Sequence, residues 1–177
     1  TEFQQLQVAD GRAPFDAAAI GRFVFEQTDS VARFLHWGRP VNFTGRGGAV
    51  RSEFGSDLER MLMLGATAKS DAEEVTGKFG LGFKSVLLAT DSPRVWSGDL
   101  SFKVVGGCLP ERWAPSAPTR DSQVRHQGAV RALRTTVVEL ALPDKTKRSE
   151  LGERFTALAG LLPVFARQIR KVIVDDE

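Results

Sequence analysis

Several features common in proteins are scarce in this 177-residue sequence, and each absence excludes a class of protein. A single cysteine, Cys108, excludes an internal disulfide framework and any metal site built from several cysteines, which suits a reducing compartment. No apolar run approaches the ~20 residues of a membrane-spanning helix. The opening residues also lack the basic and apolar regions of a secretory leader. We therefore expect a cytoplasmic protein with no membrane partner.

An excess of charge of one sign is missing as well. The chain has 24 basic and 22 acidic residues, which gives a formal net charge of +2. This balance produces no general attraction to nucleic acid or to an acidic membrane surface. The arginines between residues 112 and 134 lack the interleaved aromatic side chains that stack on bases. They predict a solvated face and no nucleic-acid partner.

The remaining composition is sufficient for one folded domain. Hydrophobic residues make up 42% of the chain, and a chain of this size buries roughly 70% of its extended surface on folding. The sequence opens without an initiator methionine and runs directly into an alternating apolar stretch. We therefore expect a single domain over residues 1–177 that is a fragment of a longer protein, truncated at its N-terminus.

Apolar spacing and turn residues predict the order of the secondary structure elements. A strand near residues 3–8 ends at the Asp10-Gly11 turn, and a helix covers residues 16–37. The later elements are a short helix over 56–64, a helix from Phe83 to the proline at 93, strands over 94–98, 99–107 and 133–143, a helix over 147–167 and a strand over 171–175. Runs of strands with segregated helices predict an α+β protein in two layers, with a mixed, mostly antiparallel sheet covered by helices on one face.

The segment GKFGLGFKS, residues 77–85, is the strongest candidate for chemistry. It fails the P-loop pattern because Phe83 stands between Gly82 and Lys84, and it fails the dinucleotide pattern because Ser85 replaces the third glycine. A glycine-rich turn that opens a helix still offers free backbone N–H groups and lets phosphate approach the main chain closely. Taken alone, the three glycines are equally compatible with tight packing of a helix on a sheet.

The order of segments around this loop resembles a known family. LERMLMLGATAKS precedes the loop, Asp91-Ser92-Pro93 follows it, and an Asp-Gly turn lies upstream. This set resembles the Bergerat ATP-binding fold of the GHKL superfamily, which contains gyrase, the large heat-shock chaperones, histidine kinases and MutL. GKFGLGFKSVLLATDSPRVWSGDLSF and the ending TTVVELALP with KVIVDD are most similar to the branch that contains sacsin. The resemblance implies a conformational-switch domain that binds ATP with Mg²⁺, with residues 38–76 as a lid and client proteins as partners.

The resemblance also implies roles for individual residues. Asp10 and Gly11 would meet the adenine, in one of two registers. Aligning the family's Asp-x-Gly on Gly11 places Ala9 at the aspartate position, whereas taking Asp10 as the aspartate places Arg12 at the glycine position. The implied nucleotide-binding residues are Asp10, Gly11, Lys69, Gly77, Gly80, Leu81, Gly82, Phe83, Lys84, Ser85 and Thr135. Phe83 is expected to turn into the core.

Catalytic residues are not assigned within this chain. In the family, hydrolysis requires a helix ahead of the first strand, with a glutamate that activates water and an asparagine that binds Mg²⁺, and we expect both upstream of Thr1. We predict that Glu26 is a surface residue of the helix expected over 16–37. His36 and His126 have no other ligand residues at the spacing of a metal site, so no metal site is predicted. Two functions stay open. One is ATP binding, with slow hydrolysis in the complete protein; the other is a degenerate module that binds no nucleotide and acts as a scaffold.

Overall fold

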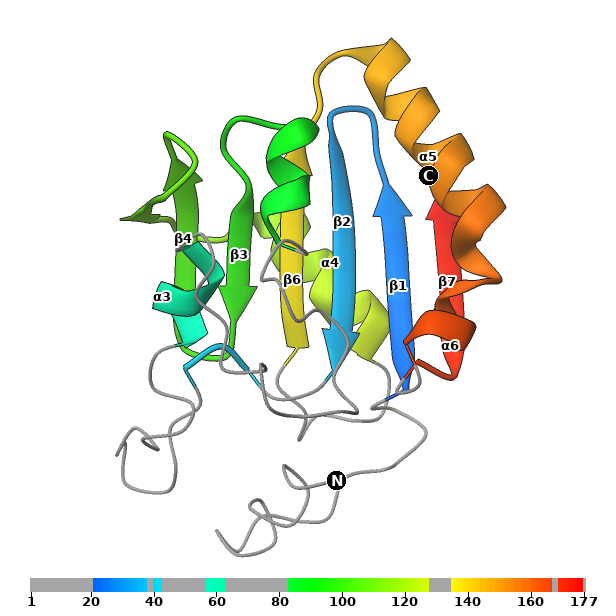
Figure 1. The fold of residues 1–177 in the computed structure, drawn as a ribbon, viewed down its shortest axis with the longest axis horizontal. Coiled ribbons are helices and arrows are strands. Elements are labelled where there is room, and N and C mark those ends of the chain that lie inside the picture. Colours follow the sequence, from blue (N-terminus) through cyan, green and yellow to red (C-terminus); the bar gives the residue numbers. More distant parts are fainter. Residues whose placement is uncertain are drawn as a thin grey trace, which may run out of the picture.

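The computed structural model describes residues 21–37, 40–42, 57–62, 83–127, 135–166 and 169–176, and Figure 1 shows their arrangement. Within these ranges the chain forms one seven-stranded sheet of order β5-β4-β3-β6-β2-β1-β7. The neighbouring strands are antiparallel, except that β1 and β7 run parallel. The predicted α+β class and the mixed, mostly antiparallel sheet are therefore confirmed.

The strands and helices have the following bounds. The strands are β1 (Arg22–Gln27), β2 (Val31–Trp37), β3 (Arg94–Ser97), β4 (Leu100–Val105), β5 (Leu109–Arg112), β6 (Thr135–Ala141) and β7 (Lys171–Asp176). The helices are α3 (Asp57–Leu62), the 3-10 helix η1 (Lys84–Leu88), α4 (Ala117–Gln127), α5 (Lys145–Ala159) and α6 (Leu162–Phe165). None of the helices in the described ranges has both the length and the apolar content to cross a membrane.

The helix predicted over 16–37 is wrong in its described part, because residues 22–37 form the β1–β2 hairpin. The turn closes where the Thr28 amide donates a 3.0 Å hydrogen bond to the Val31 carbonyl oxygen. Both strands are buried on both faces, so they lack the alternation of apolar and polar residues that marks a half-exposed strand. Their apolar residues then fall at spacings that a helix would also produce. Residues 16–20 lie outside the described residues.

The later elements follow the prediction more closely. The strands predicted over 94–98, 99–107, 133–143 and 171–175 are β3, β4, β6 and β7. The helix predicted over 147–167 is α5 followed by α6, and it begins at residue 145 because Asp144 caps it. The Asp144 carboxylate accepts from the Thr146 amide at 2.8 Å, a strong start signal for a helix. The helix predicted after Gly82 is only the short η1, and the helix predicted over 56–64 is α3.

Two elements were missed, β5 and α4, and both fall in or next to the polar stretch over 111–132. Helix α4 has almost no apolar periodicity, so a search for an apolar stripe does not find it. The strand predicted at 3–8 and most of the predicted lid over 38–76 lie outside the described residues.

The sheet carries helices on both faces, so the prediction that helices cover only one face is wrong. The second face is covered by α4, which has no apolar stripe that would indicate it. We name each face by a helix that covers it. On the η1 face, Phe25 stacks with Phe155 of α5 and Phe34 meets the same ring edge-on. Val86 of η1 and Ala89, which directly follows this helix, pack nearby. Leu62 of α3 packs on the same face, next to Val95. On the opposite α4 face, α4 contacts the sheet through polar side chains. In Figure 1, α3 and η1 lie in front of the sheet and α4 lies behind it.

Candidate functional site

The structure places four of the residues assigned to nucleotide binding: Phe83, Lys84, Ser85 and Thr135. Phe83 packs against the core beside Leu62 and Val95, as expected. Lys84 and Ser85 form the first turn of η1, directly over the η1 face of the sheet. The remaining residues of the set, Asp10, Gly11, Lys69, Gly77, Gly80, Leu81 and Gly82, lie outside the described residues.

Thr135 and Thr136 point to opposite faces of β6. Thr135 lies opposite Trp37 in the register, on the same face as Val137 and therefore on the α4 face. Thr136 shares its face with Val138, which packs against Phe83 of the η1 segment. Of the two neighbours, Thr136 is therefore the one that lies on the same face of the sheet as η1.

A group of polar residues gathers around Thr136 at one end of the η1 face. Ser97 and Thr136 are cross-strand neighbours and share a hydrogen bond of 2.6 Å between their hydroxyl oxygens. The Val41 amide donates to Ser97 Oγ at 2.9 Å. His36 lies opposite Thr136 on β2. We call His36, Ser97 and Thr136 the polar edge.

The turn after β2 is tied to α3 by a reciprocal pair of hydrogen bonds. The Asn42 amide donates to Asp57 Oδ2 at 3.1 Å, and the Leu58 amide donates to Asn42 Oδ1 at 2.9 Å. Asn42 has a φ of 50°, a left-handed conformation that asparagine tolerates better than most residues. This pair fixes α3 beside the polar edge.

His36 is half-buried, and burial alone lowers its pKa to about 4. Removing the ring from water penalises the charged form. At neutral pH the ring is therefore uncharged and can both donate and accept a hydrogen bond. The polar edge thus offers neutral donors and acceptors to a ligand, with no added charge.

A buried ionic network lies on the α4 face, where the sequence predicted an exposed glutamate. Glu26, fully buried on β1, accepts from Arg33 Nη1 at 2.6 Å. Arg33 Nε also donates to Glu139 Oε2 at 2.9 Å, and Arg94 Nη1 donates to Glu139 Oε1 at 2.8 Å. The prediction that Glu26 is a surface residue of a helix is therefore wrong on both counts.

The carboxylates of this network remain ionised although they are buried. Burial raises the pKa of Glu26, but hydrogen bonds from Ser122, Arg33 and His126 and the charge of Arg33 outweigh it, so the net pKa is lowered. The balance is the same for Glu139, where Thr119 and the two arginines lower the pKa against the effect of burial. Hydrogen bonds to the charged form stabilise that form.

Helix α4 is held to the sheet through this network. Thr119 Oγ1 donates to Glu139 Oε2 at 2.7 Å, and Ser122 Oγ donates to Glu26 Oε2 at 2.6 Å. At the end of the helix, Arg22 Nη2 donates to the His126 carbonyl oxygen at 2.9 Å. These contacts replace the apolar stripe by which a surface helix usually docks.

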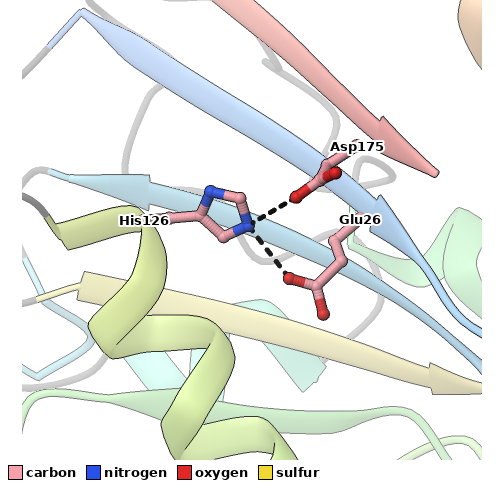
Figure 2. Close-up of side chains that lie close together, drawn as sticks. All are labelled: Glu26, His126 and Asp175. Carbon is pink, nitrogen blue, oxygen red and sulfur yellow. Dashed lines mark hydrogen bonds and ion pairs between the residues drawn. The ribbon is translucent and has the colours of Figure 1, made fainter. Parts of the chain in front are cut away.

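Three side chains with metal-binding atoms converge at the end of α4, as Figure 2 shows. His126 Nε2 lies 3.0 Å from Glu26 Oε2 and 3.3 Å from Asp175 Oδ2. Glu26 comes from β1, His126 from α4 and Asp175 from β7. No local pattern in the sequence indicates this group, because its members are separated along the chain and share no motif.

Comparisons with known proteins bear on the fold. No protein-family model matches the sequence, and no curated protein matches it either. Among solved structures, the chain is similar to the ATPase region of Saccharomyces cerevisiae topoisomerase II, with a TM-score of 0.51 and 10% sequence identity. The match covers 98% of this chain and 46% of that chain, so this chain spans less than half of its length.

A second similar structure contains the ATPase and transducer domains of DNA topoisomerase II from Balamuthia mandrillaris. Its TM-score is 0.42 and its identity 11%, over 83% of this chain and 38% of that chain. At these identities a likeness concerns the fold alone. The chain therefore has an α+β fold similar to that of the ATPase region of the yeast topoisomerase II.

Proposed function

We propose that this chain is an ATP-binding domain that holds Mg-ATP beside η1, on the η1 face of the sheet. The observation that carries this proposal is the placement of Lys84 and Ser85 on the same face as the polar edge. Lys84 and Ser85 end the glycine-rich segment and lie on the same face as a set of neutral hydrogen-bonding groups. The fold is similar to that of an ATPase region.

The phosphate end of the site rests on the glycines of residues 77–82. Backbone N–H groups without a nearby Cβ can approach phosphate oxygens closely. The five-residue η1 is too short for its dipole to add much, so the loop itself supplies the contacts. Lys84 follows the last glycine of the loop by two residues, and its charge suits phosphate neutralisation.

The base end of the site corresponds to the polar edge. The polar edge consists of residues at or next to the ends of three adjacent strands, His36, Ser97 and Thr136. These residues offer neutral donors and acceptors of the kind that recognise a purine. Thr136 would make the nucleotide contact that the family resemblance implied for Thr135. When bound, Mg²⁺ would neutralise charge on the phosphates, and its ligand is proposed to lie outside this chain.

The finer proposal is a sacsin-like conformational-switch domain that acts on client proteins and, in the complete protein, hydrolyses ATP slowly as its lid closes. It rests on the FGLGFKSV segment and the strands that follow it. A scaffold that binds no nucleotide is the second candidate. The departure of Asp10-Gly11 from the Asp-x-Gly pattern favours it.

Calorimetric titration of the chain with Mg-ATP and Mg-ADP separates these functions. We expect saturable heat that Gly82→Val strongly reduces, because the added side chain obstructs the phosphates. Gly160→Val is the matched control, since a Cβ at this exposed glycine would meet nothing within 4 Å. A folded chain that gives no heat at millimolar nucleotide would refute ATP binding and support the scaffold.

A further inference from the structure

We propose that Glu26, His126 and Asp175 form a zinc-binding site that fastens α4 to strands β1 and β7. Figure 2 shows the three side chains reaching one point from three different elements. The site lies on the α4 face, whereas the proposed nucleotide contacts lie on the η1 face.

The spacing of the ligand atoms matches a tetrahedral ion. Zinc binds imidazole nitrogen and carboxylate oxygen at about 2.0–2.2 Å, so neighbouring ligand atoms in a tetrahedron lie roughly 3.3–3.5 Å apart. His126 Nε2 is 3.0 Å from the Glu26 oxygen and 3.3 Å from the Asp175 oxygen. All three ligand atoms lie within 4.8 Å of one another. An ion at their centre requires only a small outward adjustment.

A hydrogen bond donated by His126, without a metal ion, accounts less well for this arrangement of the two carboxylates. A ring N–H group points in one direction in the ring plane, and its bond weakens steeply when the angle departs from linearity. Both carboxylates nevertheless approach the same nitrogen, Nε2 of His126. Zinc would take the lone pair of Nε2, leaving the proton on Nδ1. A proton held on Nε2 would pass to solvent as the zinc ion enters.

The surroundings of Glu26 resemble the outer shell of a metal site. Ser122 Oγ donates to Glu26 Oε2, and Arg33 donates to the other oxygen of the same carboxylate. Hydrogen bonds of this kind orient a ligating carboxylate and are a regular feature of metal centres. The carboxylate is therefore already held in the direction that an ion requires.

Access from solvent also suits a cation. The carboxylates of the buried network, Glu26 and Glu139, pair with the guanidinium groups of Arg33 and Arg94. The Asp175 side chain is 33% exposed and gives an ion a route from solvent.

A third guanidinium, that of Arg125, lies at the rim of this site. Its Nη1 is 4.0 Å from Asp175 Oδ2, the same oxygen that would bind zinc, and its side chain is 42% exposed. At this distance and exposure the ion pair is weak. The Asp175 carboxylate can therefore exchange this weak ion pair for zinc.

The experiment uses the whole chain, treated with a chelator and free of nucleotide, so that its outcome does not depend on ATP binding. Titration with Zn²⁺ is expected to give one bound ion per chain, and Co²⁺ in its place is expected to give the visible absorption bands of a four-coordinate ion. Zinc should also slow amide hydrogen exchange in α4, which no adventitious surface ion would do.

Two variants and one control test the ligands. Asp175→Asn and His126→Gln are each expected to weaken zinc binding by at least about tenfold. Asp121→Asn, at an exposed position on the same helix, should leave it unchanged. Asp175 is partly exposed, so its variant keeps the buried network and should fold normally. Equal zinc affinity in Asp175→Asn and the parent chain, or no saturable binding by a folded parent chain, would overturn the proposal.

Discussion

Glu26 and Arg33 face each other across the β1–β2 hairpin and form an ion pair of 2.6 Å. Their side chains are 0% and 5% exposed, so two opposite charges lie almost completely out of water. Each is satisfied by further partners: Glu26 by Ser122 and His126, and Arg33 by Glu139. The two residues are paired in the register of the hairpin, and Glu26 also binds Ser122 of α4.

Replacing Arg33 with methionine is expected to destabilise the fold by about 3–5 kcal/mol, because two buried carboxylates lose a compensating charge. The free energy of unfolding, measured by urea denaturation, tests this. Arg154→Met is the control: Arg154 pairs with Glu150 on the exposed surface of α5, and its loss should cost less than about 1 kcal/mol. A cost for Arg33→Met as small as that of the control would show that the network is not needed for stability.

The stability of the domain should fall as the pH drops from 6.5 toward 4. The pKa of His36 is about 4 in the folded chain, below the ordinary histidine value of 6.5. Between these two values the unfolded state therefore binds more protons than the folded state. The contribution is fully present above pH 6.5 and is lost by pH 4, on the order of 2 kcal/mol for this half-buried ring.

His36→Gln should flatten this part of the pH profile, as followed by urea denaturation. The chain has two histidines, so an NMR titration can assign each ring by comparison with the variant. A pKa near 6.5 for His36 would contradict the prediction.

Adjacent threonines offer a matched test of the nucleotide face. Thr136→Val should weaken Mg-ATP binding, because Thr136 belongs to the polar edge and bonds Ser97. Thr135→Val should leave binding unchanged, since Thr135 lies on the α4 face. Calorimetry measures both affinities, and thermal unfolding checks that both variants fold. The reverse result, with Thr135 required and Thr136 dispensable, would place the base on the other face of the sheet.

Gly152 and Gln27 should be energetically coupled. A Cβ at Gly152 would collide with the Gln27 amide oxygen, and the Gln27 amide nitrogen donates to the Arg148 carbonyl oxygen at 2.8 Å. Gly152→Ala is therefore expected to destabilise the parent chain, despite the gain of about 1 kcal/mol in helix propensity.

In a Gln27→Ala background the collision is absent, and the same substitution should stabilise α5 by about 1 kcal/mol. A double-mutant cycle from denaturation curves gives the coupling energy. If the effects of the two substitutions are additive, the Gln27 side chain does not depend on the missing Cβ at Gly152, and the prediction fails.

Local sequence determined a large part of the fold. Residues 94–105, 135–141 and 171–176 carry β-branched runs bounded by turn residues and form strands as predicted. Asp144 is a strong N-cap and starts α5. The glycine segment over 77–82, taken together with the segments around it, indicated a candidate phosphate loop. These features depend on interactions within a few residues, which the sequence displays directly.

Tertiary structure alone decided the hairpin over 22–37, the facing of Thr135 and Thr136, and the meeting of Glu26, His126 and Asp175. A strand buried on both faces has no alternating pattern, so only its hydrogen-bonded partners distinguish it from a helix. Helix α4 docks through polar groups whose partners lie far away in the chain. Pairing, burial and the convergence of charged side chains are set by distant segments, because each lowers the free energy only when both partners are in place.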